Sequence, residues 1–155
     1  MLLRSHTWFI VALIALAGFN LAELELLVVN YFTGHQYPDT QFFFVTFWLW
    51  AAAGLLAAYA GLVGGYQAIR QGNLSNPYLT AFCFLMSCTG KVDGQELGWS
   101  AVRLSFHLGF SRLALGVNVV GVGLLILLAT FREQAAVAAV VGSGPRITDR
   151  PDGAV

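Results

Sequence analysis

The sequence predicts an all-α integral membrane protein, a four-helix bundle with a short amphipathic interfacial helix before the last span. Of its 155 residues, 57% are hydrophobic and only 10% are Asp, Glu, Lys or Arg, against about 25% charged residues in a soluble domain. Long uncharged segments recur along the chain between short polar connections. The eight basic and eight acidic side chains cancel, which excludes a broad electrostatic surface for nucleic acid.

The first span is expected at residues 8–29. Apolar residues run without a break from Trp8 to Phe19 and resume after two glutamates. A basic residue before the apolar run and small residues inside it are also typical of a secretory signal peptide. Both interpretations stay open, and the resumed apolar stretch favours a membrane helix.

The second span, at residues 42–66, is the strongest. No charge appears between Asp39 and Arg70, which exceeds the roughly 20 residues that cross a bilayer. Aromatic residues crowd its first third, as in an interfacial belt. Small residues recur at a spacing of four, which predicts close helix packing, within the chain in preference to a second copy. These residues are Ala53, Ala57, Gly61 and Gly65.

The third span, at residues 74–92, is weak, because only Pro77 to Cys88 is densely apolar. A re-entrant segment is the alternative. The last span is expected at residues 113–131. Together the spans make a membrane domain of residues 1–133, followed by a short polar tail at 134–155.

An amphipathic helix is expected just before the last span. Its apolar positions recur at spacings of three and four, which is a helical pattern, and such a helix would lie in the headgroup region or extend the last span. The positions are Trp99, Val102, Phe106, Phe110 and Leu113.

Charge placement favours four spans over three. The positive-inside rule does not decide, since both topologies place five basic residues inside and three outside. Four spans, with the N-terminus inside, place Glu23 and Glu25 on the same outer side as Arg103 and Arg112. Charges inside a membrane are usually paired, so this topology offers the glutamates partners.

The polar residues of the first span are the candidate site. Asn20 and Glu23 share one side of the helix, whereas Glu25 points about 200° round from Glu23. One interpretation is a polar path that carries a proton or a solute. The other is structural: the carboxylates reach the outer interface or pair with Arg103 and Arg112.

No motif indicates catalysis or a bound cofactor. The sequence has no HExxH or CxxC motif, and its histidines do not occupy spans at matching depth, so neither a metal nor a haem is predicted. Nucleotide-binding loops and the nucleophile elbow are also missing. We therefore predict a protein that is not an enzyme.

Several short segments recur in one known family. They are Asn30-Tyr31-Phe32-Thr33-Gly34, Phe42-Phe43-Phe44, the Ala/Gly-rich body to Gly65, Ile69-Arg70, and Cys88 with Lys91. On these segments, over residues 30–131, the chain resembles the plant AWPM-like plasma-membrane proteins, small four-span proteins linked to abscisic acid, cold and dormancy. Its third span is shorter, its Lys91–Ser111 connection is longer, and the acidic residue expected near Arg103 is missing.

Two functions follow as hypotheses. The resemblance implies a plasma-membrane protein that eases the passage of a small amphipathic acid such as abscisic acid, and it carries no binding residue over. The candidate polar groups for such passage, taken from the charge pattern of the chain, are Asn20, Glu23 and Arg112. The alternative is a non-catalytic accessory subunit of a larger respiratory or photosynthetic complex in an organelle membrane. The expected partners are the lipid bilayer and other membrane subunits or a second copy, and not nucleic acid.

Overall fold

The computed structural model describes residues 2–34, 37–38, 40–97, 105–110 and 112–142. Its helices are α1 (Leu2–Phe32), α2 (Gln41–Gln71), α3 (Pro77–Ser87) and α4 (Val119–Gly142). Between α3 and α4 lie four strands, β1 (Cys88–Val92), β2 (Gln95–Leu97), β3 (Ser105–Phe110) and β4 (Leu113–Asn118).

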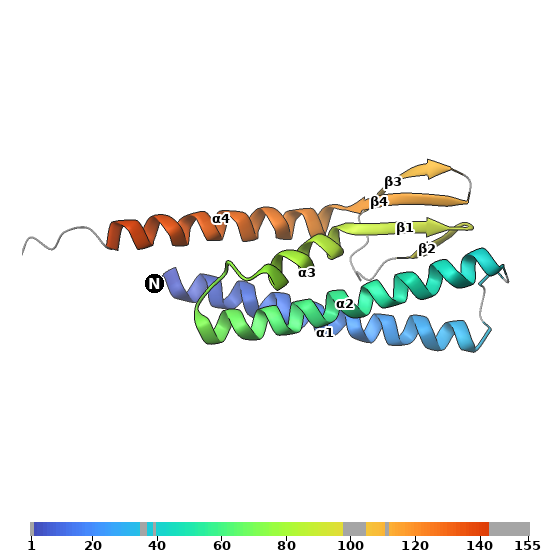
Figure 1. Ribbon diagram of the computed structural model, residues 1–155, viewed down its shortest axis with the longest axis horizontal. Coiled ribbons are helices and arrows are strands. Elements are labelled where there is room, and N and C mark those ends of the chain that lie inside the picture. The colour runs from blue at the N-terminus through green and yellow to red at the C-terminus, as the bar shows by residue number, and fades with distance from the viewer. Residues whose placement is uncertain (1, 35–36, 39, 98–104, 111, 143–155) are drawn as a thin grey trace, which may run out of the picture.

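The chain runs along its long axis four times (Figure 1). Helices α1 and α2 are two full passes, α3 continued by β1 is the third, and β4 continued by α4 is the fourth. The start of α1 and the end of α4 therefore lie toward the same end, here called the helix end, and the strands lie toward the other, the sheet end. Helices α1, α2 and α4 are long and apolar enough to cross a membrane, so the chain is a membrane protein.

Local signals set the helix boundaries. Helix α2 begins after Thr40, whose side-chain oxygen accepts a hydrogen bond from the Phe43 amide, and ends at Gly72 in the left-handed conformation, which glycine adopts without a steric penalty. Helix α3 begins after Asn76, which caps the Tyr78 amide, and has Pro77 in its first turn. Both starts satisfy amides that a helix leaves unpaired.

The main core forms where α1, α2 and α3 meet, and α4 adds to it through Leu128. Small residues let the helices approach closely: a methyl group at Gly61 would lie 2.6 Å from the Ala17 Cβ of α1 and 2.8 Å from the Phe82 ring of α3. The largest fully buried side chains of this core are Leu13, Leu79, Phe82 and Met86.

The sheet is antiparallel, in the order β2-β1-β4-β3. Asp93 and Gly94 turn β1 into β2, and both have positive φ, 46° and 86°. Asp-Gly with this geometry is the turn that best fits the twist of a two-residue hairpin. The hairpin packs on the sheet end of α2, where Val92 and Leu97 bury Phe43 and Phe47.

The expectation of an all-α fold is confirmed only in part. The described residues are mostly helical, but residues 88–97 and 105–118 contain a four-stranded sheet. The expected interfacial helix is wrong over the described part of its stripe: Phe106 lies in strand β3, and Leu113 opens strand β4. The apolar residues of 105–118 fit both a helical spacing and a strand alternation. Within each strand every second residue is apolar, and pairing in the sheet puts these side chains on one face. They are Phe106 and Leu108 in β3, and Leu113, Leu115 and Val117 in β4. Residues 98–104 lie outside the described residues.

The span boundaries change accordingly. The first two helices cover the spans expected at 8–29 and 42–66 and extend past them. The expected third span, 74–92, is an 11-residue helix followed by a strand, and the expected fourth, 113–131, begins as a strand and becomes helical only at Val119. The expected tail at 134–155 is helical to Gly142, and the remainder lies outside the described residues.

Candidate functional site

Asn20 lies inside the core, at 1% exposure. Its Nδ2 atom donates a hydrogen bond to the Met86 sulfur of α3 at 2.7 Å. Its Oδ1 atom is buried and has no hydrogen-bond partner among the described residues. A buried acceptor left unpaired costs about 1–3 kcal/mol, so this side chain is a cost to the fold.

The two glutamates of α1 are more exposed than Asn20. Glu23 is half-buried and Glu25 is exposed. Within the described part of the chain, neither carboxylate forms an ion pair. The structure therefore does not gather Asn20, Glu23 and Glu25 into one polar path.

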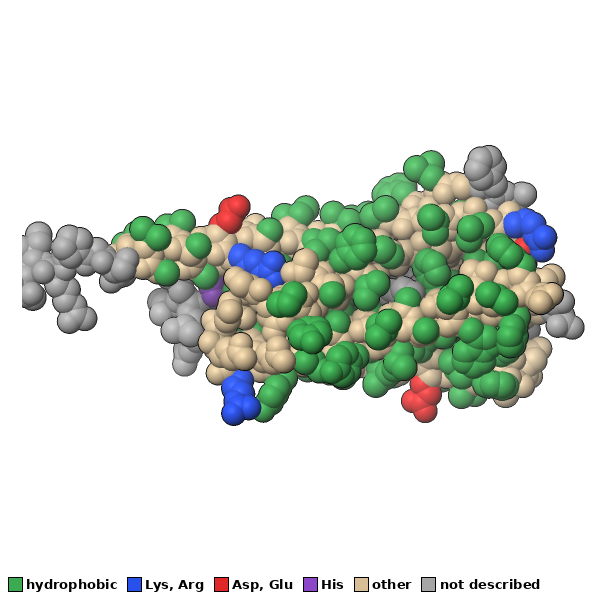
Figure 2. Space-filling model, in the orientation of Figure 1, with side chains coloured by type: hydrophobic (Ala, Val, Ile, Leu, Met, Phe, Trp, Pro, Cys, Tyr) green, Lys and Arg blue, Asp and Glu red, His purple; other side chains and the backbone are tan. Residues whose placement is uncertain are grey.

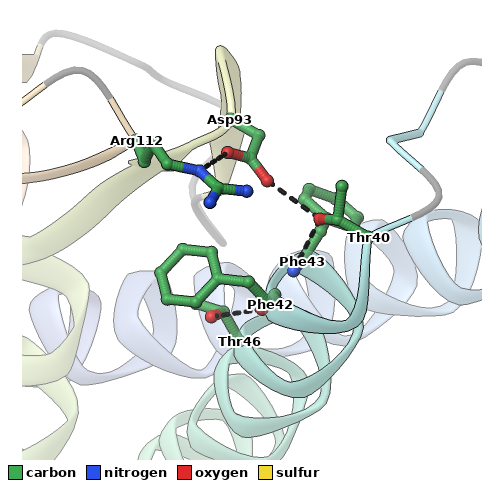
Figure 3. A network of polar contacts seen from close by, with 6 residues as sticks. All are labelled: Thr40, Phe42, Phe43, Thr46, Asp93 and Arg112. Carbon is green, nitrogen blue, oxygen red and sulfur yellow. Dashed lines mark hydrogen bonds and ion pairs between the residues drawn. The ribbon is translucent and has the colours of Figure 1, made fainter.

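Arg112 pairs with an aspartate that the sequence analysis did not single out (Figure 3). Its Nε atom donates to Asp93 Oδ1 at 3.1 Å, and its guanidinium lies 5.4 Å from the centre of the Phe42 ring. Asp93 Oδ2 accepts a second hydrogen bond, from Thr40 Oγ1 at 3.0 Å. The expected pairing of Arg112 with a glutamate of α1 is wrong, and Arg103 lies outside the described residues.

This network ties the β1–β2 turn to the first residue before α2. The hydrogen bond from Arg112 holds the pKa of Asp93 below its ordinary value, and the hydrogen bond from Thr40 acts in the same direction. A carboxylate with such partners stays ionised in mildly acidic solution. The network is therefore an anchor between sheet and helix, and the Asp-Gly turn was the sequence signal that could have revealed it.

A second polar cluster joins the passes at the helix end. Arg132 of α4 donates to the carbonyl oxygens of Leu74 and Asn76, at 2.8 and 3.1 Å, and to Thr80 Oγ1 at 2.8 Å. Asn76 also donates to Gln67 of α2 at 2.6 Å. Arg132 therefore holds α4 to the α2–α3 connection, a structural use of this arginine.

The small residues of α2 face other parts of the same chain. Ala57 is fully buried and Ala53 packs beside it at the core. Gly61 lies against α1 and α3, as described above, and a methyl group at Gly65 would overlap Ile14 of α1. In α4, Gly121 lies against the Ser87 backbone of α3.

The membrane can be placed on the helices by counting residues from the basic side chains at the helix end. The rings of His6 and Phe131 contact at 5.0 Å, tilted by 58°, at the helix end. The basic residues of the other two membrane-length helices at this end are Arg70, in the last turn of α2, and Arg132, which follows Phe131. At 1.5 Å per residue, about 30 Å of helix runs from His6 to Leu26 and from Arg70 to Trp50. With the helix end as one edge, a hydrocarbon core of about 30 Å would therefore end at Leu26 and Trp50.

The fourth pass reaches the same level only with the sheet. From Arg132 to Val119, α4 gives about 20 Å, and β4, at about 3.3 Å per residue, completes the thickness near Leu115. Leu115 pairs with Gly90 of β1, and Gly90 lies against the Trp50 ring, so the counts agree. We call the level of Leu26, Trp50 and Leu115 the sheet-side boundary.

Exposed apolar side chains cross this boundary on α1 and α2. Phe32 is 72% exposed and lies 6.0 Å from the Trp48 ring, which contacts the Phe44 ring edge-on at 6.4 Å. Beside them lies a shallow hollow of about 550 Å³, lined by Phe44, Val45, Trp48 and Leu49. Its lining side chains are all apolar.

A second hollow, of about 430 Å³, continues this surface along α1. It is lined by four apolar side chains and Glu25, namely Leu21, Leu24, Glu25, Val28 and Val29. Val29 lies one helical turn before Phe32, whose ring lies 6.0 Å from the Trp48 ring of the first hollow. We call Glu25, Val29, Phe32, Phe44 and Trp48 the outer surface.

Charge is sparse over the rest of the molecule. Figure 2 shows hydrophobic side chains over much of one face, with Lys and Arg side chains toward the two ends of the bundle. No group of three or more His, Cys, Asp or Glu that could hold a metal ion occurs among the described residues. The arrangement offers surfaces for contact and no converging reactive groups in that part of the chain.

Comparisons with protein-family models, with curated proteins and with solved structures gave no match to this chain. The resemblance to AWPM-like proteins therefore stays a prediction from short motifs.

Proposed function

We propose that this protein is a non-catalytic accessory subunit that binds a larger membrane protein through its outer surface. The observation that carries the proposal is the exposed aromatic group of Phe32, Phe44 and Trp48. Phe44 lies about 9 Å beyond Trp50 along α2. That distance exceeds the headgroup layer of about 5–8 Å on each side of the hydrocarbon.

Lipid tails do not cover side chains at that height. An exposed apolar patch beyond the headgroups would contact water, and such patches mark protein contacts. The outer surface also carries Glu25, which lies within about 2 Å of the sheet-side boundary along α1. A carboxylate at the edge of hydrocarbon is best paired with a cation. The partner that fits is an apolar helix with a Lys or Arg near its membrane boundary.

The geometry supports passage of a small amphipathic acid less well. Such a role needs a cation for the carboxylate beside an apolar path, and Arg112 is engaged by Asp93. Asn20 is enclosed by the core, and the hollow beside Trp48 has only apolar lining residues.

The test compares two double variants of α2 in the membranes of the source cells. Phe44→Ala with Trp48→Ala removes the aromatic part of the outer surface. Leu55→Ala with Tyr59→Ala is the matched control, because both residues are on the same helix and are 55% and 58% exposed. Native gel electrophoresis after mild solubilisation reports the size of the assembly.

We expect the wild type and the control to migrate in a discrete assembly, and the aromatic variant to migrate as the free protein. Glu25→Gln should weaken the assembly without abolishing it. A wild type that migrates alone, or an aromatic variant that stays in the assembly, contradicts the proposal. Uptake of a weak acid by vesicles of the pure protein, lost in Glu23→Gln, would favour a facilitator instead.

A further inference from the structure

The β3–β4 half of the sheet presents an apolar face that the described chain leaves uncovered. Cross-strand partners share a face, and Phe106 pairs with Val117 while Leu108 pairs with Leu115. Each of these side chains is more than half exposed: Phe106 73%, Leu108 86%, Leu115 61% and Val117 52%.

The β1–β2 half of the same face is buried. Val92, which pairs with Leu113, is fully buried against α2. The opposite face is polar: Lys91 and Glu96 are directly paired across β1 and β2, and His107 lies 3.5 Å from the Glu96 carboxylate. The sheet is therefore amphipathic, and half of its apolar side extends beyond the helix that it covers.

The height of this apolar face coincides with the membrane edge. Leu115 lies at the sheet-side boundary, which puts its partner Leu108 at the same level. Val117 and Phe106 lie about 7 Å deeper, two strand residues toward α4. Because β4 continues into α4 at Val119 without a loop, the face is fixed at that height by a membrane-length helix.

We propose that the β3–β4 face inserts into the sheet-side leaflet and is covered by lipid acyl chains. The part of α4 from Val119 to Arg132 covers about 20 Å, about 10 Å less than the hydrocarbon thickness, and the inserted strands supply the difference. The inserted pairs satisfy each other's backbone groups through the β3–β4 ladder. The outer edge of β3 is open. At Leu108 it meets headgroups and water, and the outward backbone groups about 7 Å deeper, at Phe106, need water that enters along this edge, because hydrocarbon offers them no partner.

The test places a fluorescent label on each face of the sheet at one height. Leu108→Cys reports the apolar face and Lys91→Cys the polar face, and both positions are exposed. Cys88→Ser removes the partly exposed native thiol, and Cys83 is buried and stays. Each full-length variant is labelled with bimane and reconstituted into phosphatidylcholine vesicles, and quenching is measured with nitroxide-labelled phosphatidylcholine and with aqueous iodide.

We expect the lipid nitroxide to quench the label at Leu108 severalfold more than the label at Lys91, and iodide to show the reverse order. A label at Phe106→Cys should respond best to a nitroxide carried deeper in the acyl chain. Iodide quenching at Leu108 equal to that at Lys91 would overturn the proposal in favour of a water-exposed sheet. Protection of Leu108 from both quenchers would overturn it in favour of a protein contact, such as a second copy.

Discussion

Replacement of Gly61 by alanine tests the packing of the three central passes. The added methyl group would lie 2.6 Å from the Cβ atom of Ala17 and 2.8 Å from the Phe82 ring. The first of these neighbours is attached directly to the α1 backbone and has no rotamer to change. The helices themselves must therefore move apart.

The expected magnitude follows from a comparison with Gly18. A methyl group at Gly18 has nothing within 4 Å, so Gly18→Ala makes the same chemical change on a helix without the overlap. Both variants gain the same helix propensity, about 0.5–1 kcal/mol. The difference between them isolates overpacking, about 1–3 kcal/mol, and we place Gly61→Ala at the upper end because its closest neighbour is rigid.

The assay is reversible unfolding in mixed detergent micelles, followed by tryptophan fluorescence, with both variants measured against the wild type. Ala17→Gly should recover much of the loss when combined with Gly61→Ala, since it removes the opposing methyl group. Such coupling is expected only for residues in contact.

Equal free energies of unfolding for Gly61→Ala and Gly18→Ala would refute the reasoning. Additive behaviour of Ala17→Gly and Gly61→Ala would also contradict the close approach of α1 to α2. In either case the small residues of α2 would have to serve another surface.

Three further outcomes are expected from the polar groups. Because the pKa of Asp93 is lowered in the folded protein, its ionised form stabilises the fold at any pH above its ordinary pKa of 3.8, and this stabilisation is lost as pH falls through the folded-state pKa. The free energy of unfolding, measured at neutral pH and at about pH 3, should therefore fall in the wild type by more than it falls in Asp93→Asn, which has no carboxylate to protonate. Arg132→Gln should lower the free energy of unfolding by about 2–4 kcal/mol, since several hydrogen bonds to a charged group are lost, whereas Arg70→Gln, at an exposed position, should change it little. Asn20→Leu should preserve or raise the melting temperature, because it removes an unpaired buried acceptor at similar volume, and a clear loss would show that the Asn20 amide stabilises the fold.

The membrane location and the first two helices could be predicted from the sequence. Composition and uncharged run length are local properties, and a bilayer about 30 Å thick converts them directly into helices of sufficient length. The start of α2 was predicted to within one residue, whereas the helix ends five residues after the expected span, at Gln71. Charges at Asp39 and Arg70 limit the apolar run, and the small-residue spacing that includes Gly61 marks a contact side on any helix.

Only the tertiary structure decided the last third of the chain. Residues 105–118 fit both a helical stripe and a strand alternation, and pairing with β1, far away in sequence, selected the strands. The partner of Arg112 could not be predicted either, because Asp93 reaches it only when β1 pairs with β4. Sequence spacing determines which residues share a helix side. Which charge meets which depends on contacts between distant segments, and those form only when the whole chain packs.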